Sequence, residues 1–331
     1  MIGSTLGAGS AHTPLRYLSA ADVEGCLPDV GERLDLATRA LVALARDEAE
    51  MPPKIGVHPR PGALIHAMPA WLRGPDLTGL KWVAAFPDNR RLSLPAINGL
   101  VVLNDAATGV PTWIMDAARI TAVRTAAVSG MAIRHFRPGA DTVAILGAGV
   151  QARSHMEVVN SLLPHAHVAL FDRHPERAEA IATELNEAQR REWVTPAESA
   201  RSAVADADVV ITVATLGADT QQLRPEWLQT GALLVAVDFA TYVGSELARA
   251  AAQFVVDDRQ QFLHYREIGY FPDYPEPTAT LGEVADGHSE PPELAQSVLV
   301  THLGVGLADI LFADSIRQVA QRRHAGIELP R

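Results

Sequence analysis

One short run constrains the fold of this chain more than any other part of it. Residues 141–152 read DTVAILGAGVQA, which predicts an apolar strand, a glycine turn and the start of a helix. In that setting the pattern G-x-G-x-x-A is typical of dinucleotide binding. Gly147 permits the tight turn, Gly149 lets backbone approach a pyrophosphate, and Ala152 keeps the helix close to the sheet. The helix N-terminus then offers N–H groups and partial positive charge to the phosphates.

A second strand ends in an acid at the spacing that this motif requires. Residues 168–172 read VALFD, which places Asp172 25 positions beyond Gly147. An acid near that spacing hydrogen-bonds the ribose 2′-hydroxyl of NAD. Arg173 follows directly and could instead accept the 2′-phosphate of NADP. We therefore predict NAD as the cofactor, with NADP as the alternative.

The pattern beyond the glycine turn alternates strands and helices. We predict strands at 142–146, 167–171, 208–213, 232–237 and 253–256, with helices at 150–162, 175–187, 197–204 and 245–251. This alternation is typical of a doubly wound parallel sheet of the Rossmann type.

The first part of the chain has a different pattern. Short apolar runs separated by Pro and Gly clusters predict strands at 54–57, 63–68, 80–86, 99–103 and 112–115. Turn residues at 104–109 predict a hairpin, and a long helix is expected over 116–137. We expect a discontinuous α+β domain over 14–137, to which 300–325 return within a helical region at 293–323. The dinucleotide-binding domain would then span 138–299.

The composition of the chain limits which domain number, binding partners and cellular compartment we expect. A chain of 331 residues exceeds what one core usually supports, which favours two domains. The net charge of −11 argues against nucleic acid or an anionic membrane as a partner. The only cysteine is Cys26, and we predict no metal site. No apolar run approaches membrane-spanning length, and residues 1–13 lack the pattern of a signal peptide. A cytoplasmic protein with a small-molecule substrate is the simplest expectation.

Several charged residues stand where charge is unusual. Arg124 lies within a helix rich in Ala, Ser and Thr, where it could fork onto a carboxylate or join a surface ion pair. Lys81 interrupts an apolar strand and could meet a bound anion or face solvent, and Lys54 is a weaker case. His66 is a candidate proton donor or a structural histidine. Asp238 ends an apolar strand, where doubly wound folds place ligands, or is simply a loop acid.

Taken together, these motifs resemble the ornithine cyclodeaminase/mu-crystallin family. The resemblance covers roughly residues 15–320 and rests on five stretches. They are LKWV at 80–83, GLVVLND at 99–105, ITAVRTAA at 120–127 with Ser129, GAGVQAR at 147–153, and LG at 303–304.

The resemblance implies a homodimer whose members use NAD(P) to oxidise amino acids or reduce imines. Lys81 and Arg124 match positions that bind the substrate carboxylate, and Lys54 matches a third. Family positions that contact the cofactor correspond to Thr125, Ser129, Val150, Gln151, Asp172 and Thr215 here, and Thr301 and His302 fall in the segment that approaches the nicotinamide. Val237, at the end of a predicted strand, is a further cofactor-binding candidate.

One departure from the family pattern bears on the reaction. Cyclodeaminases of the family carry a catalytic Asp at the position of Ala240, and the nearest acid here is Asp238. Cyclisation of ornithine needs a group that holds and deprotonates the distal ammonium, which alanine cannot do. We therefore expect an imine reductase or amino-acid dehydrogenase, with Lys81, Asp238 or His66 handling the proton. A cyclodeaminase or a non-catalytic NAD(P)-dependent ligand-binding protein is the alternative.

Overall fold

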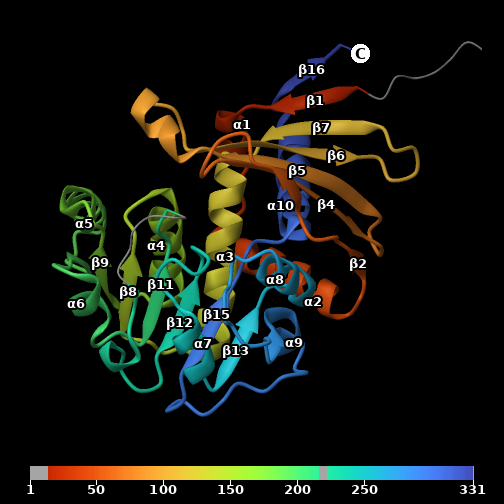
Figure 1. Ribbon diagram of the computed structural model, residues 1–331. Coiled ribbons are helices and arrows are strands. Elements are labelled where there is room, and N and C mark those ends of the chain that lie inside the picture. The colour runs from red at the N-terminus through yellow and green to blue at the C-terminus, as the bar shows by residue number, and fades with distance from the viewer. Residues whose placement is uncertain (1–13, 216–221, 331) are drawn as a thin grey trace, which may run out of the picture.

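Two eight-stranded sheets organise the chain (Figure 1). The computed structural model describes residues 14–215 and 222–330. The first sheet consists of β1 (Leu15–Leu18), β2 (Ala49–Glu50), β3 (Ile55–Val57), β4 (Leu64–Leu72), β5 (Leu77–Ala85), β6 (Ile97–Asn104), β7 (Pro111–Asp116) and β16 (Ile327–Leu329). Its order is β16-β1-β7-β6-β5-β4-β2, with β3 also on β4, and every pair is antiparallel except β1 with β7.

The second sheet is entirely parallel. It consists of β8 (Thr142–Leu146), β9 (His167–Phe171), β10 (Val194–Pro196), β11 (Val209–Thr212), β12 (Leu233–Ala236), β13 (Gln253–Val256), β14 (Ala279–Thr280) and β15 (Val298–Thr301). Its order is β10-β9-β8-β11-β12-β15-β13-β14. The predicted doubly wound sheet is confirmed. Every residue of β11, β12, β13 and β15 is buried, as expected for parallel strands covered on both faces.

The helices connect and cover these sheets. They are α1 (Ala20–Gly25), α2 (Val30–Ala45), α3 (Ala118–Phe136), α4 (Val150–Leu162), α5 (Pro175–Gln189), α6 (Ala200–Val204), α7 (Ser245–Ala250), α8 (Arg259–Glu267), α9 (Leu281–Ala285) and α10 (Gly306–Arg323), with 3-10 turns η1 (Pro87–Leu92) and η2 (Pro225–Trp227). None of the helices in the described part of the chain combines the length and apolar character that a bilayer crossing requires.

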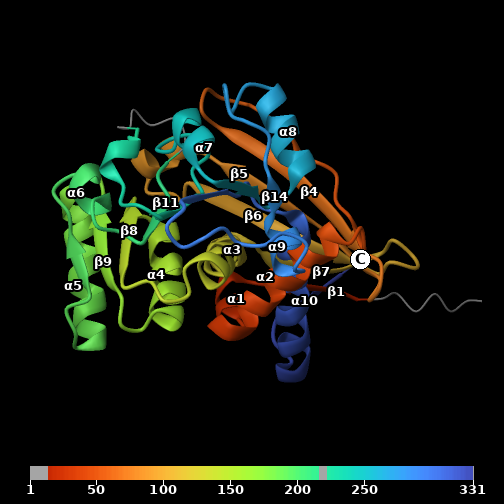
Figure 2. The same cartoon turned by 90° about the horizontal axis from the view of Figure 1, so that it is seen from below.

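Helix α3 stands between the two sheets in both views (Figures 1 and 2). It packs against α4 on one side and α2 on the other, and it also touches β6 and β12. Small residues allow this close packing, and the helix is buried continuously from Ala122 to Ile133. Arg124 is therefore carried on a buried helix face rather than on the surface.

One prediction for the C-terminal region was wrong. We expected helix throughout 293–323, but residues 298–301 form β15, which lies between β12 and β13. The sequence VLVT has the β-branched character of a buried strand. The positive φ of Gly304 (+87°) belongs to the turn between β15 and α10, which begins at Gly306. Helix α10 packs against β4, β5 and β6 of the first sheet.

A continuous hydrophobic cluster joins the two sheets. Alternate strand residues of the parallel sheet, such as Val143 and Val235, share one cluster with Val101 of the first sheet and with Ile310 of α10. The opposite face of the parallel sheet has a separate core. Because one core spans both halves, the space between the two sheets is held in a defined geometry.

Candidate active site

A cavity of about 300 Å³ lies where the two sheets meet, and a smaller groove continues from it. Its walls come from β4 and β5, from α3, and from the loops that follow β8, β11, β12 and β15. Gly149, Val213, Ala214 and Thr215 line both the cavity and the groove. The carboxyl ends of parallel strands are where doubly wound folds bind ligands.

The groove has the local geometry of a dinucleotide site. Gly147 has φ +114°, and a Cβ there would lie 2.8 Å from the carbonyl oxygen of Val213. A Cβ at Gly149 would meet no atom within 4 Å, so the space above this turn is open. The Asp172 carboxylate accepts hydrogen bonds from the backbone N–H groups of Ala148 and His174, at 2.7 and 2.9 Å. Asp172 therefore lies at the glycine turn and lines the groove.

Two arginines also line this groove. Arg173 and Arg177 both line it, together with Tyr242. Arg177 was not singled out from the sequence. Two guanidinium groups beside Asp172 suit a phosphate as well as a ribose hydroxyl.

Lys81 and Arg124 face one cavity from two different elements. Lys81 comes from β5 and is 1 % exposed, whereas Arg124 comes from α3 and is 5 % exposed. Both meet Asp309 of α10, which is fully buried. Arg124 Nε donates to Asp309 Oδ1 at 3.0 Å. Lys81 Nζ lies 2.7 Å from Oδ2, so the two side chains form an ion pair.

Lys54 adds a third cation to the same cavity. Its Nζ donates to the carbonyl oxygen of Leu303 at 2.6 Å and lies over the rings of Phe239 and Tyr265. The buried carboxylate of Asp257 attracts it from nearby. When Lys81 is protonated and both carboxylates are ionised, three cations face the carboxylates of Asp257 and Asp309, an excess of one positive charge. A buried excess charge of this kind favours a singly charged anion.

Burial shifts the protonation of both lysines. Desolvation, with Arg124 contributing and Asp309 opposing, lowers the pKa of Lys81 to about 7. Desolvation also lowers the pKa of Lys54 to about 8. Lys81 can therefore both donate and accept a proton near neutral pH.

The remaining wall of the cavity is largely apolar and contains no Asp or Glu among the described residues. Phe239 closes one side and stacks on Phe271, with ring centroids 5.6 Å apart. His66 lies near Tyr265, and burial, with Lys54 contributing, lowers the pKa of His66 to about 4. His66 is therefore neutral at physiological pH.

The structure does not bring Asp238 into this cavity. Its carboxylate accepts hydrogen bonds from Thr212 Oγ1 at 2.6 Å and from the Ala214 N–H at 3.1 Å. Burial raises the pKa of Asp238 to about 7. The neighbouring residues Val237 and Phe239 line the cavity, but neither Asp238 nor Ala240 does. Asp238 follows β12 and is hydrogen-bonded to the end of β11, so the expectation that it handles a proton in the cavity was wrong.

A chain of polar side chains lies behind the cavity wall. Ser129 Oγ is 2.8 Å from His155 Nε2 and 2.9 Å from His302 Nε2, and His155 Nδ1 is 2.7 Å from the carbonyl oxygen of Gln151. Burial lowers the pKa of His155 to about 4 and that of His302 well below its ordinary value. His302 lines the cavity, whereas Ser129 contacts it only through His302.

Most residues singled out from the sequence converge here. The residues that line the cavity or the groove are Lys54, His66, Lys81, Arg124, Thr125, Gly147, Gly149, Val150, Gln151, Asp172, Arg173, Thr215, Val237 and His302. Ala152 is fully buried behind the turn, in the place expected for close helix–sheet packing.

Besides Arg177, the interpretation of the sequence missed Asp309, Phe239 and His155. Asp309 lies in the apolar run LADIL, and an acid in such a run signals a buried ion pair. Phe239 follows Asp238 and has φ +58°, a backbone state that its sequence does not indicate. His155 was also overlooked, because its one partner side chain lies 26 residues away in the chain.

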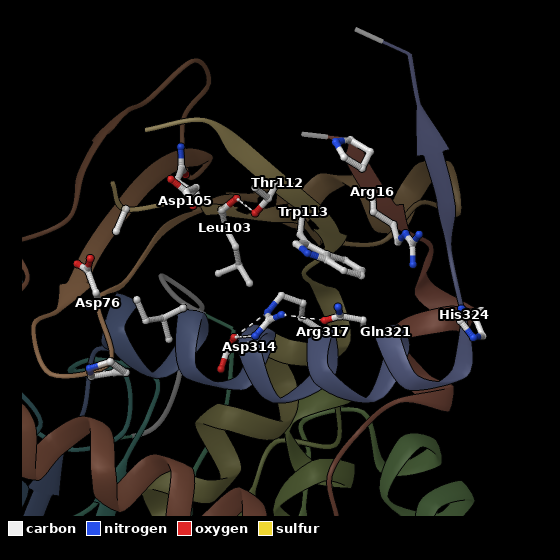
Figure 3. A pocket seen from close by; sticks show the side chains of 15 residues that line it. Arg16, Asp76, Leu103, Asp105, Thr112, Trp113, Asp314, Arg317, Gln321 and His324 are labelled. Carbon is white, nitrogen blue, oxygen red and sulfur yellow. Dashed lines mark hydrogen bonds and ion pairs between the residues drawn. The ribbon is translucent and has the colours of Figure 1, made fainter. Parts of the chain in front are cut away.

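A larger cavity, of about 690 Å³, lies elsewhere and carries no comparable chemistry (Figure 3). It lies between α10 and the strands β1, β6 and β7. Its charged residues already have partners, since Arg317 pairs with Asp314 and Arg16 pairs with Glu328. None of its described lining residues has a buried polar side-chain atom without a hydrogen-bond partner. The smaller cavity between the sheets is therefore the candidate active site.

A Rossmann-type sheet joined to a cation-lined cavity defines a class of nucleotide-dependent proteins that bind small anions. The model of the ornithine cyclodeaminase/mu-crystallin family matches residues 17–324, so the chain belongs to that family. It is 32 % identical over 321 residues to the nodulation efficiency protein NfeD of Rhizobium meliloti, covering 95 % of this chain and 98 % of that one. It is also 32 % identical over 255 residues to mouse ketimine reductase mu-crystallin, covering 75 % and 78 %.

A solved structure extends the likeness to three dimensions. The Δ1-pyrroline-2-carboxylate reductase of Thermococcus litoralis, in complex with NADH and L-proline, matches with a TM-score of 0.85 and 25 % identity. The match covers 95 % of this chain and all of that one. The family resemblance inferred from the motifs is confirmed.

Proposed function

We propose that this protein is an NAD(P)-dependent oxidoreductase that acts on the C–N bond of a small, carboxylate-bearing imine or amino acid. The observation that carries the proposal is a cavity lined by three cationic side chains, with no Asp or Glu among its described lining residues, continuous with the groove at the glycine turn. Relatives with ketimine and pyrroline-carboxylate reductase names support the same chemistry.

The chain's own residues have distinct tasks in this proposal. Arg124 and Lys81 bind the substrate carboxylate, while Asp309 holds both cations against α10. A bound nicotinamide would supply or accept a hydride at C4, and the carboxylate contacts orient the substrate carbon toward it. Lys81 is the proton donor that the geometry favours, because its pKa is about 7 and it lies in the cavity. NAD is the proposed cofactor, and Arg173 with Arg177 also suits NADP.

The apolar wall favours a substrate without a distal charge. A distal ammonium, as in ornithine, would meet Phe239 and neutral His66 and would find no carboxylate among the described lining residues. Desolvating that ammonium without a partner is costly. This supports imine reduction or amino-acid oxidation over cyclodeamination.

Steady-state assays with NADH and NADPH test the proposal. Cyclic ketimines that carry a carboxylate, such as Δ1-pyrroline-2-carboxylate, should be reduced, and 2-methyl-1-pyrroline, which lacks the carboxylate, should have a kcat/KM lower by roughly 100-fold or more. Arg124→Ala should raise the KM for the carboxylate substrate by about 10- to 100-fold. Binding without turnover of any imine would indicate a ligand carrier instead, and ammonia release from ornithine would indicate a cyclodeaminase.

We also propose a division of labour between the two parts of the chain. Residues 14–137, with 300–325, would form the substrate-binding and dimerisation domain, and 138–299 would bind the cofactor. The packing of α10 on β4 and β5 supports this division. A homodimer is supported by the outer face of the first sheet, where Trp82 and Leu100 are cross-strand neighbours and are 47 % and 39 % exposed.

A further inference from the structure

The hydrogen bonds around Ser129 determine which nitrogen of His302 carries its proton. A carbonyl oxygen only accepts, so His155 Nδ1, 2.7 Å from the Gln151 carbonyl, must carry a hydrogen. His155 is neutral, so its Nε2 accepts, and the Ser129 hydroxyl donates to it. Ser129 has then used its one hydrogen, and its contact with His302 requires that His302 Nε2 donates. In neutral His302 the remaining nitrogen, Nδ1, therefore has a free lone pair.

That lone pair has no partner among the described residues. His302 is 1 % exposed and lines the cavity. Its Nδ1 atom is buried and makes no hydrogen bond within the described part of the chain. Unpaired buried polar atoms are uncommon in folded proteins, so one on a residue that lines a cavity calls for a partner within that cavity. Gln151 Oε1, on the same cavity, is a second buried acceptor without a partner.

The position of His302 indicates which part of a ligand it meets. Ser129 and His155 tie it to α3 and to α4, the helix that starts at the glycine turn. On its other side, Gly304 lies against the guanidinium of Arg124. His302 therefore lies between the nucleotide turn and the carboxylate-binding cations, where the reactive ring of a nucleotide would be.

We propose that His302 Nδ1 accepts a hydrogen bond from the carboxamide NH₂ of a bound nicotinamide. His155 and Ser129 hold the proton of His302 on Nε2, which leaves Nδ1 free to accept this hydrogen bond. Pyrophosphate and carboxylate oxygens only accept and cannot pair with this nitrogen, whereas the carboxamide and the ribose hydroxyls donate. The carboxamide is the donor carried by the reactive ring itself, beside which His302 lies. The inference rests on the proposed use of a nicotinamide cofactor. It adds a specific recognition element that is formed by three side chains from two helices and a loop.

Cofactor analogues test the hydrogen bond directly in the wild-type protein. Dissociation constants would be measured by calorimetry for NADH, for reduced 3-acetylpyridine adenine dinucleotide, which replaces NH₂ by CH₃, and for reduced thionicotinamide adenine dinucleotide, which keeps NH₂. We expect the acetyl analogue to bind about five- to tenfold more weakly than the other two. Equal binding of NADH and the acetyl analogue would overturn the proposal.

Variants locate the effect at His302. His302→Ala should weaken NADH binding to the level of the acetyl analogue, whose own affinity should change little. His302→Asn, which keeps an acceptor near the Nδ1 position, should restore part of the preference for NADH. Gln253→Met is the matched control, because it removes another buried side-chain oxygen without a hydrogen-bond partner among the described residues, on β13 and outside the cavity lining. An equal loss for both cofactors in His302→Ala would show that the ring only packs, and would also overturn the proposal.

The two proposals fail separately. Imine turnover without discrimination between NADH and the acetyl analogue would refute the role of His302 and leave the proposed reaction intact. Discrimination in binding without turnover of any imine would refute the reaction and support the role of His302.

Discussion

At the scale of single residues, the site depends on Asp309, which is shared by two cations. A fully buried carboxylate is stable only when it is paired, and here Lys81 and Arg124 both pair with it. The same arrangement leaves Lys81 with a pKa of about 7, since burial and Arg124 lower it while Asp309 raises it. Protonated Lys81 is the form that attracts a substrate carboxylate.

This coupling predicts the pH dependence of the reaction. The kcat/KM for a carboxylate ketimine should fall as pH rises through about 7, because Lys81 of the free enzyme loses its charge there. Asp309→Asn removes the group that raises this pKa, so the fall should begin at lower pH. Asp314→Asn, on the same helix and paired with Arg317, is the control and should leave the profile unchanged. A profile in which Asp309→Asn and wild type coincide would contradict the coupling.

The lowered pKa of Lys81 also makes the free energy of unfolding depend on pH. Its pKa in the folded protein, about 7, is below the ordinary lysine value, so the unfolded chain binds more protons between about pH 7 and pH 10.5. The contribution of Lys81 to the free energy of unfolding should therefore increase as pH rises through that window and stay constant below it.

At the scale of elements, the turn between β15 and α10 joins the parallel sheet to the helix that packs on the first sheet. Gly304 has φ +87°, and a Cβ there would lie 2.5 Å from Nη1 of Arg124. The Gly304 N–H donates to Asp257 and its carbonyl oxygen accepts from Gln261 Nε2, which holds the turn in place. The absence of a side chain at this position lets the Arg124 guanidinium occupy the cavity wall.

Gly304→Ala should therefore cause two separable defects. The left-handed backbone should cost about 1–2 kcal/mol in the free energy of unfolding, measured by urea denaturation. Displacement of Arg124 should in addition raise the KM for the carboxylate substrate. Gly287→Ala is the matched control, because it has φ +75° but no atom within 4 Å of the added Cβ. It should lose similar stability with an unchanged KM, and a raised KM in this control would contradict the assignment.

At the scale of the whole molecule, the first sheet has two different faces. Lys81 and Gly79 of β5 face the cavity and α10, whereas Trp82 lies on the opposite face next to Leu100. Helix α10 covers only the first of these faces. Exposed apolar pairs on a regular sheet face favour association with a second copy.

Self-association is tested by mass in solution. Light scattering should give about twice the 35.4 kDa chain mass for the wild-type protein. The double substitution Trp82→Glu and Leu100→Glu should shift the mass toward that of one chain, because burying the new carboxylates would be costly. Ile268→Glu, at an exposed apolar residue after α8, should not. A monomeric wild-type protein would refute the proposed interface.

The local sequence determined much of this protein. The strand–glycine turn–helix pattern and the alternation after it specify the parallel sheet, because a turn residue and its neighbours act on one another directly. The same holds for Lys81 and Arg124, since charge within an apolar strand or a small-residue helix requires a partner.

Only the tertiary structure decided which partner each charge found. Asp309 reaches Arg124 across 185 positions, and Ser129 reaches His302 across 173. Asp238, which the sequence placed at a strand end, turned to Thr212 instead of the cavity. Strand β15 was missed because a run as short as VLVT shows no periodicity that separates strand from helix, and its pairing with β12 and β13 decides the outcome. Propensity acts between neighbours in the chain, whereas an ion pair or a strand pair is chosen by the fold that brings distant residues together.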